Sequence, residues 1–251
     1  MTPNLPRQLQ AIAYDREADA YLRSLPLEHF MEATDQANQR RITLASLTLV
    51  EARRSDFHVF NELLIQYPLP HRRKPGQVVP DNMVVRTSER IRARKSYNVP
   101  LEPEPPFWVL EYVSQGNPRK DYDESFRKYE RDLKVPYYLI FHPENHELTL
   151  YRHNRRRYVS VKPNEHGRYP IQELELEVGL VDGWVRFWFL GQLLPLPEEL
   201  QSDLEATRRR ADEEKRRADE AQHRFDEETL LVEDLQRQLE AAKRQLAKLG
   251  H

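Results

Sequence analysis

The stretch Phe107-Trp108-Val109-Leu110-Glu111-Tyr112-Val113 carries one carboxylate inside an otherwise apolar run. Aromatic and β-branched residues at this density predict a buried strand. A carboxylate in such a strand is costly to bury unless it is paired, protonated or coordinated to a cation. Glu111 therefore marks this segment both as a core strand and as a candidate site.

A second acid stands at the start of another predicted strand. Asp81 follows Pro80 and directly precedes Asn82-Met83-Val84-Val85. Two carboxylates on neighbouring core strands would suit Mg²⁺, which takes oxygen ligands and keeps several waters for chemistry. The alternative is structural: Asp81 caps a turn, and Glu111 forms a buried ion pair with an arginine. Spacing alone leaves both interpretations open.

The remainder of residues 1–197 has the pattern of a mixed α/β domain. The expected order is helix, strands, helix, strand and hairpin. Helical spacing of apolar residues predicts helices over 15–22, 39–53 and 122–133. Runs rich in β-branched and aromatic residues predict strands over 59–67, 78–85, 107–113, 137–142, 148–152 and 158–161.

The composition excludes several classes of protein. The chain of 251 residues has no cysteine, which removes thiol nucleophiles, disulfides and cysteine-ligated metal sites. Its seven glycines cannot form a Walker loop or a dinucleotide fingerprint. No apolar run approaches the ~20 residues that cross a bilayer, and the first residues lack a secretory signal. We therefore expect a soluble, cytoplasmic protein with no membrane partner.

A long charged helix is predicted from Glu198 onward. Alternating steps of three and four residues give fifteen positions, of which twelve are apolar and three, Thr207, Glu214 and Glu228, are weak points. This heptad spacing predicts a coiled coil over 198–251 that joins two copies, most simply as a homodimer. The alternative is a single solvated helix, because the first half of the seam is rich in alanine. The twelve apolar positions are Leu200, Leu204, Ala211, Ala218, Ala221, Phe225, Val232, Leu235, Leu239, Ala242, Leu246 and Leu249.

These segments, in their order along the chain, resemble a known family. Pro80-Asp81, Glu111-Tyr112-Val113, Tyr129 and Val135-Pro136-Tyr137-Tyr138-Leu139-Ile140-Phe141-His142-Pro143 are similar to the Uma-type family of putative restriction endonucleases. That family belongs to the PD-(D/E)XK nuclease superfamily. The resemblance implies a restriction-endonuclease-like α/β fold over 1–197, with helices flanking a mixed sheet, followed by the coiled-coil helix of 198–251.

The resemblance also implies roles for individual acids. Asp81 and Glu111 would hold Mg²⁺, with Mn²⁺ as an alternative, and would serve the hydrolysis of DNA phosphodiester bonds. Glu32, on the first helix of the family domain, would complete the site as an outer metal ligand. The alternative for Glu32 is an ordinary solvated carboxylate.

The lysine of the superfamily motif is displaced in this sequence. Superfamily members carry it two residues after the second acid to orient the attacking water, and that position is Val113. The Uma-type family supplies a lysine from the following helix, at the position of Ser125. Lys128 lies three residues further on, so we expect it to take the catalytic role, with Arg127 and Lys120 as further candidates. A solvated lysine is the alternative.

Two functions of different classes follow from these features. The first is a metal-dependent DNA endonuclease, which the acid pair favours. The second is a non-catalytic nucleic-acid-binding or assembly protein on a nuclease scaffold, multimerised by its coiled coil. The displaced lysine and the formal net charge of −2 favour the second. An RNA or nucleotide phosphodiesterase is a third alternative.

Overall fold

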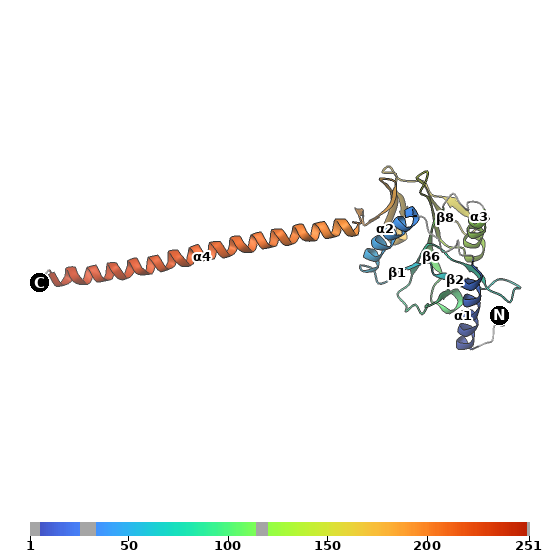
Figure 1. The fold of residues 1–251 in the computed structure, drawn as a ribbon, viewed down its shortest axis with the longest axis horizontal. Coiled ribbons are helices and arrows are strands. Elements are labelled where there is room, and N and C mark those ends of the chain that lie inside the picture. Colours follow the sequence, from blue (N-terminus) through green and yellow to red (C-terminus); the bar gives the residue numbers. More distant parts are fainter. Residues whose placement is uncertain (1–5, 26–33, 114–119, 250–251) are drawn as a thin grey trace. The chain divides into compact units, whose positions relative to one another are not determined.

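The computed structural model describes residues 6–25, 34–113 and 120–249. The chain forms two compact units, Met1–Leu196 and Pro197–His251. The expected mixed α/β fold, with a long C-terminal helix, is confirmed. The elements, many of them labelled in Figure 1, are α1 (Arg7–Ser24), α2 (Thr34–Glu51), β1 (Phe57–Asn61), β2 (Leu64–Tyr67), β3 (Gly76–Val78), β4 (Asn82–Arg86), β5 (Ser96–Asn98), η2 (Val99–Leu101), β6 (Pro106–Tyr112), α3 (Lys120–Arg127), η3 (Lys128–Leu133), β7 (Tyr137–His142), β8 (Glu147–His153), β9 (Tyr158–Ser160), β10 (Tyr169–Ile171), η4 (Gln172–Leu174), β11 (Leu176–Val181), β12 (Trp184–Phe189), β13 (Gln192–Leu193) and α4 (Pro197–Leu249).

A six-stranded mixed sheet forms the centre of the first unit. Its strand order is β1-β4-β6-β7-β8-β9, and only the β6–β7 pair is parallel. A parallel pair needs a crossover connection, and the segment that contains α3 and η3 provides it. The sheet therefore places the crossover helices beside the strand that carries Glu111.

Two predicted strands prove to be two strands each. The segment 59–67 is broken after β1, where Glu62 adopts a left-handed φ of 46°. The segment 78–85 is broken by Val79-Pro80-Asp81, and Pro80 has no N–H to continue a ladder. In both cases the two halves join different sheets, because β2 pairs with β3 and with β5 in a separate three-stranded sheet. The predicted continuous strands were wrong for this reason.

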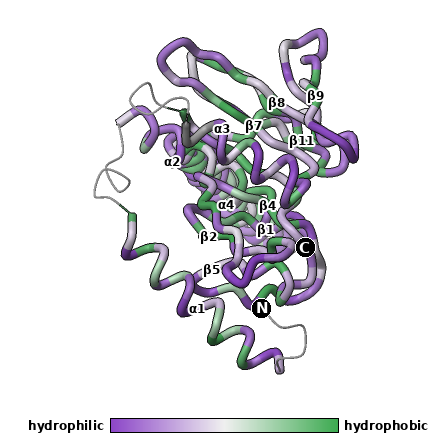
Figure 2. Tube along the Cα trace, turned by 90° about the vertical axis from the view of Figure 1, so that its right-hand side faces the viewer, coloured by the Kyte–Doolittle hydropathy of each residue, from purple (hydrophilic) through white to green (hydrophobic). Residues whose placement is uncertain are grey.

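Side-chain alternation along β6 separates two cores. Trp108, Leu110 and Tyr112 face one core, which α2 and the four-stranded sheet β10-β11-β12-β13 complete. Val109 faces the other core, together with Tyr129 of η3 and residues of the three-stranded sheet. Glu111 follows Val109 by two residues, so its side chain lies on this second face. In Figure 2 the tube at the middle of the unit is mostly green and the outer loops are mostly purple.

Buried amides fasten the flanking helices. Gln66 of β2 donates to the carbonyl of Tyr14 in α1 at 2.9 Å, and Figure 1 shows α1 beside β2. Gln39 of α2 donates to the carbonyl of Val185 in β12 at 3.0 Å and accepts the Val185 N–H at 2.8 Å. Both glutamines are fully buried. Their hydrogen bonds satisfy groups that would otherwise be costly to bury.

The second unit is the 53-residue helix α4. Its seam residues are uncovered in the single chain: Phe225, Val232, Leu235 and Leu239 are 63, 52, 54 and 57% exposed. Among the described residues, no helix is long and apolar enough to cross a membrane.

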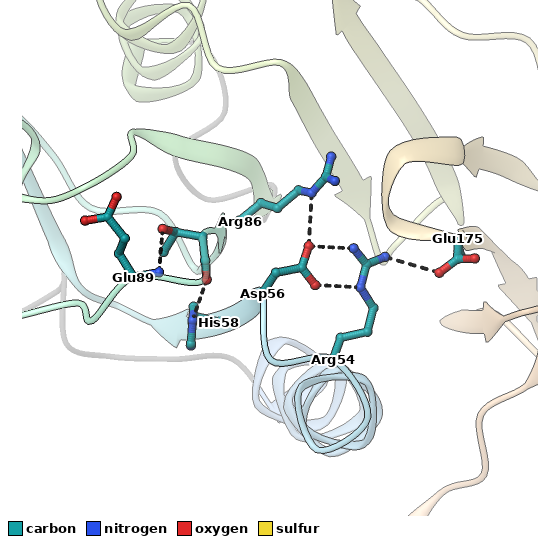
Figure 3. A network of polar contacts seen from close by, with 7 residues as sticks. Arg54, Asp56, His58, Arg86, Glu89 and Glu175 are labelled. Atoms are coloured by element: carbon teal, nitrogen blue, oxygen red, sulfur yellow. Dashed lines mark hydrogen bonds and ion pairs between the residues drawn. The ribbon is translucent and has the colours of Figure 1, made fainter.

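An ion-pair network joins the end of α2 to β1 and β4 (Figure 3). Asp56 accepts hydrogen bonds from Arg54 at 2.9 and 2.8 Å and from Arg86 at 3.1 Å. Arg54 also reaches Glu175 at 3.5 Å. The hydrogen bonds from Arg54, followed by those from Arg86, lower the pKa of Asp56 to about 2. The network therefore favours the ionised carboxylate in the folded state.

We expect Asp56→Asn to lower the free energy of unfolding by about 1 kcal/mol near neutral pH, since the pair is partly screened by solvent. The folded pKa is depressed, so the stabilisation is present above about pH 4 and is lost as the pH falls toward about 2. Urea unfolding at several pH values measures this difference. Glu165→Gln, at a carboxylate whose side chain is 86% exposed, is the control and should change stability little. A deficit that stays constant with pH would contradict the electrostatic explanation.

Candidate active site

Strand register brings the two predicted acids together. Asn82 pairs with Leu110 in the antiparallel β4–β6 ladder. Asp81 lies one residue before Asn82 and Glu111 one residue after Leu110, so the two acids lie opposite each other. The two carboxyls face each other across the ladder, and burial together with the charge of Asp81 raises the pKa of Glu111. The sequence prediction that these acids are neighbours is thus realised in the fold.

Two elements on either side hold the acid pair in place. The Tyr112 N–H donates to Oδ2 of Asp81 at 2.6 Å, and the Tyr129 hydroxyl of η3 donates to Oε1 of Glu111 at 2.7 Å. From α2, Nη2 of Arg40 lies 3.7 Å from Oδ1 of Asp81 and 2.7 Å from Oε1 of Glu62. The alternative without a metal expected an arginine to pair with Glu111. The arginine, Arg40, instead lies near Asp81, and Glu111 accepts a hydrogen bond from the Tyr129 hydroxyl.

Burial and neighbouring negative charge, from Glu62 at Asp81 and from Asp81 at Glu111, shift both acids toward the protonated form. Burial raises the pKa of Asp81 to about 6, although the Tyr112 N–H and the Arg40 charge oppose the shift. Burial, followed by the charge of Asp81, raises the pKa of Glu111 well above its usual range, although the Tyr129 hydroxyl opposes the shift. Asp81 still keeps 24% of its side chain exposed. The nearby positive charge is therefore too small to keep both carboxyls ionised, and solvent can reach the pair through Asp81.

This donor set fits a hard divalent cation. Two adjacent carboxylates with raised pKa values can exchange a proton for Mg²⁺ or Mn²⁺, both of which prefer oxygen ligands. Two protein ligands are enough for Mg²⁺, because it usually retains several waters. Within 6–25, 34–113 and 120–249, no three His, Cys, Asp or Glu side chains gather as a metal cluster.

Comparison with known proteins identifies the family. The family model Uma2, described as a putative restriction endonuclease, matches residues 28–185. The chain belongs to the Uma2 family. The resemblance to this family, inferred from Asp81, Glu111 and the strand at 137–142, is confirmed. The matched range contains both acids.

Two further comparisons accompany the Uma2 match. The chain is similar to the crystal structure of a putative nuclease belonging to DUF820 from Anabaena variabilis ATCC 29413. That similarity has a TM-score of 0.45 and 13% identity, and it covers 57% of this chain and 75% of the other. A search of curated proteins found no match.

The other predicted site residues of this Uma2 chain have different outcomes. Glu32 lies outside the described residues. Nζ of Lys128 lies 2.7 Å from Oε1 of Glu124, and Lys128 lines a groove with Tyr67 and Asp132. The next residue, Tyr129, is the one that contacts Glu111. The catalytic role of Lys128 remains a prediction.

Sequence reasoning missed Arg40 as a contact of the acid pair. It falls inside the predicted helix 39–53, next to Arg41, and composition does not distinguish the two. Helical spacing offers a signal, because Arg40, Thr43 and Leu47 follow the 3–4 repeat of one face. Thr43 and Leu47 are fully buried, and the side chain of Arg40 is 18% exposed.

We expect Glu111→Gln to raise the free energy of unfolding of the Uma2 protein by about 1–2 kcal/mol near pH 7.5 in the presence of a chelator. The folded pKa values of the acid pair are raised, so the wild type loses stability as the pH rises from about 4 through about 6. The amide oxygen can still accept the Tyr129 hydroxyl. Urea unfolding should show the gain at neutral pH and little of it near pH 4.5. A loss of stability at neutral pH would mean that the carboxylate is structurally required.

Proposed function

We propose that this Uma2 protein is a metal-dependent endonuclease that hydrolyses DNA phosphodiester bonds. The observation that carries the proposal is the paired Asp81 and Glu111, which lie opposite each other on two core strands and are held by the Tyr112 N–H and the Tyr129 hydroxyl. The Uma2 family model, described as a putative restriction endonuclease, supports the same class of function. Two buried carboxyls with raised pKa values lower the stability of the fold at neutral pH. Such a pair is more consistent with a catalytic or metal-binding site than with an acid that only caps a turn.

Mg²⁺, or Mn²⁺, would be held by Asp81 and Glu111, with Glu32 proposed as an outer ligand. When bound, the ion would lower the pKa of a water and neutralise charge on the scissile phosphate. The chain's own groups position the ligands: the Tyr112 N–H orients Asp81, and the Tyr129 hydroxyl orients Glu111. Both contacts come from rigid elements, which favours a preorganised site.

Two cations are candidates for stabilising the transition state. Lys128 is the candidate from sequence, and its ammonium pairs with Glu124. Arg40 is the candidate from structure, because its guanidinium lies 3.7 Å from Asp81 and is braced by Glu62. A guanidinium there could act on the phosphate that the acids approach.

We expect Asp81→Asn and Glu111→Gln to reduce Mg²⁺- or Mn²⁺-dependent nicking of plasmid DNA by about 100-fold or more, while the fold persists. Calorimetry should show weaker metal binding by both variants. Asp182→Asn, at an exposed turn, is the matched control and should nick like the parent. Undiminished nicking by either acid variant would refute the site. A parent that binds DNA but nicks no substrate at any metal concentration would favour the non-catalytic alternative, which Val113 in place of lysine supports.

The two candidate cations can be separated by kinetics. If Arg40 is the catalytic cation, we expect Arg40→Gln to lower turnover by about 10- to 100-fold with little change in DNA affinity. If Lys128 is the catalytic cation, we expect Lys128→Ala to have this effect instead. The other substitution should alter affinity at most. Single-turnover nicking and fluorescence anisotropy measure the two quantities. Equal losses of affinity and rate at one position would instead assign that side chain to phosphate anchoring.

We also propose that α4 joins two copies into a homodimer through a coiled coil. The exposed seam supports this proposal, since apolar residues at heptad spacing gain stability only against a partner helix. The seam is weak between Ala211 and Ala221, where alanines bury little area, and stronger from Val232 to Leu249, so the C-terminal half should contribute most of the association.

We expect truncation after Pro197, or Leu235→Asp with Leu239→Asp, to convert a dimer into a monomer at tens of micromolar, as measured by sedimentation. Leu230→Asp is the matched control, because Leu230 is 63% exposed but lies off the seam. It should leave the dimer intact. A full-length chain that is monomeric at this concentration would favour the solvated single helix.

A further inference from the structure

The seam of α4 contains two alternating sets of positions. The first set, here the a positions, is Leu204, Ala211, Ala218, Phe225, Val232, Leu239 and Leu246. The second set, here the d positions, is Leu200, Thr207, Glu214, Ala221, Glu228, Leu235, Ala242 and Leu249. Both glutamates of the seam fall in the d set. Every a position is uncharged.

This distribution distinguishes the two orientations of a helix pair. In a parallel pair in register, each d residue faces the same d residue of the other copy. Glu214 would then face Glu214, and Glu228 would face Glu228, with like charges opposed inside the seam. In an antiparallel pair, d residues face a residues. No antiparallel register with d facing a opposes two seam glutamates, because the a set has no charge.

The sizes of the seam residues favour the same orientation. A parallel pair places Ala218 against Ala218 and Ala221 against Ala221, which leaves little apolar area to bury in the first half. An antiparallel pair that overlaps from Leu204 to Leu249 sets two of the four seam alanines against larger residues and leaves Ala211 opposite Ala242. Ala218 then faces Leu235, and Ala221 faces Val232. Layers that combine a small and a large residue fill space more evenly.

The length of the helix allows this overlap. α4 is one uninterrupted helix of 53 residues, and its described seam residues are exposed along both halves. Phe225 and Glu228 face each other near the middle of the overlap. The pairing therefore uses the seam from Leu204 to Leu249 and not only the part after Val232.

We propose that α4 pairs with a second copy of this chain in antiparallel orientation, with Leu204 of one copy opposite Leu249 of the other. This inference rests on the self-association proposed above. The residues 204 of the two copies are then separated by the rise of 45 residues, about 70 Å. Because the globular unit precedes α4 in the chain, the two globular units join the pair at opposite ends. One dimer therefore presents its two acid pairs to separate places and not to both strands at one place.

Cysteine crosslinking tests the orientation, and the chain contains no native cysteine to interfere. Ala218→Cys and Leu235→Cys are made separately, each in the full chain, with an affinity tag on one of them. Three samples are treated with a short bismaleimide: each variant alone, and the mixture of the two after subunit exchange. Mass spectrometry then identifies the covalent dimers. Asp219→Cys mixed with Leu235→Cys is the matched control, because position 219 neighbours 218 but lies off the seam.

Antiparallel pairing predicts a covalent heterodimer in the mixture and no covalent dimer of Ala218→Cys alone, since its two cysteines lie about 26 Å apart. The control mixture should crosslink at least 10-fold less. Efficient crosslinking of each variant with itself would overturn the antiparallel orientation but would still support self-association through α4. A dimer by sedimentation that crosslinks in neither way would overturn this register. A monomeric chain would refute the self-association itself, and with it this inference.

Discussion

The antiparallel pairing of β4 with β6 is the constraint on which the candidate site depends. It sets Asp81 opposite Glu111, and the elements around it are arranged to hold that contact. Tyr112 shows how: its N–H holds Asp81, while its hydroxyl lies 2.6 Å from Oγ1 of Thr43 and 2.9 Å from Oδ1 of Asn82. One residue of β6 thereby ties α2 and β4 to the strand that carries Glu111.

The acid pair destabilises the fold that contains it. Burial favours neutral carboxyls, yet a metal site needs charged ones, so the folded chain is less stable at neutral pH without a cation. The cores on the two faces of the central sheet offset this cost with large buried residues, including Trp108 and Tyr129. Glu111 lies on a central strand with buried core residues on both of its faces.

Sequence reasoning recovered what local patterns determine. Strand β7 was predicted at its observed bounds, and the neighbouring acids followed from two apolar runs. Sequence reasoning failed where long-range pairing decides: the segment 59–67 is rich in apolar residues on both sides of Glu62, and the turn at Glu62 sends its two halves to different sheets. Arg40 was missed because its role depends on how α2 packs, which one sequence does not specify. Glu32 lies outside the described residues, so its proposed role still rests on the resemblance alone.

The buried Gln39 has a consequence beyond holding α2 in place. Its amide makes two hydrogen bonds to the backbone of Val185, as a neighbouring strand would, and the next residue is Arg40. A displacement of β12 would therefore be transmitted through one peptide unit to the guanidinium beside Asp81. The four-stranded sheet therefore helps to set the position of the helix that carries Arg40, in addition to covering one face of the core.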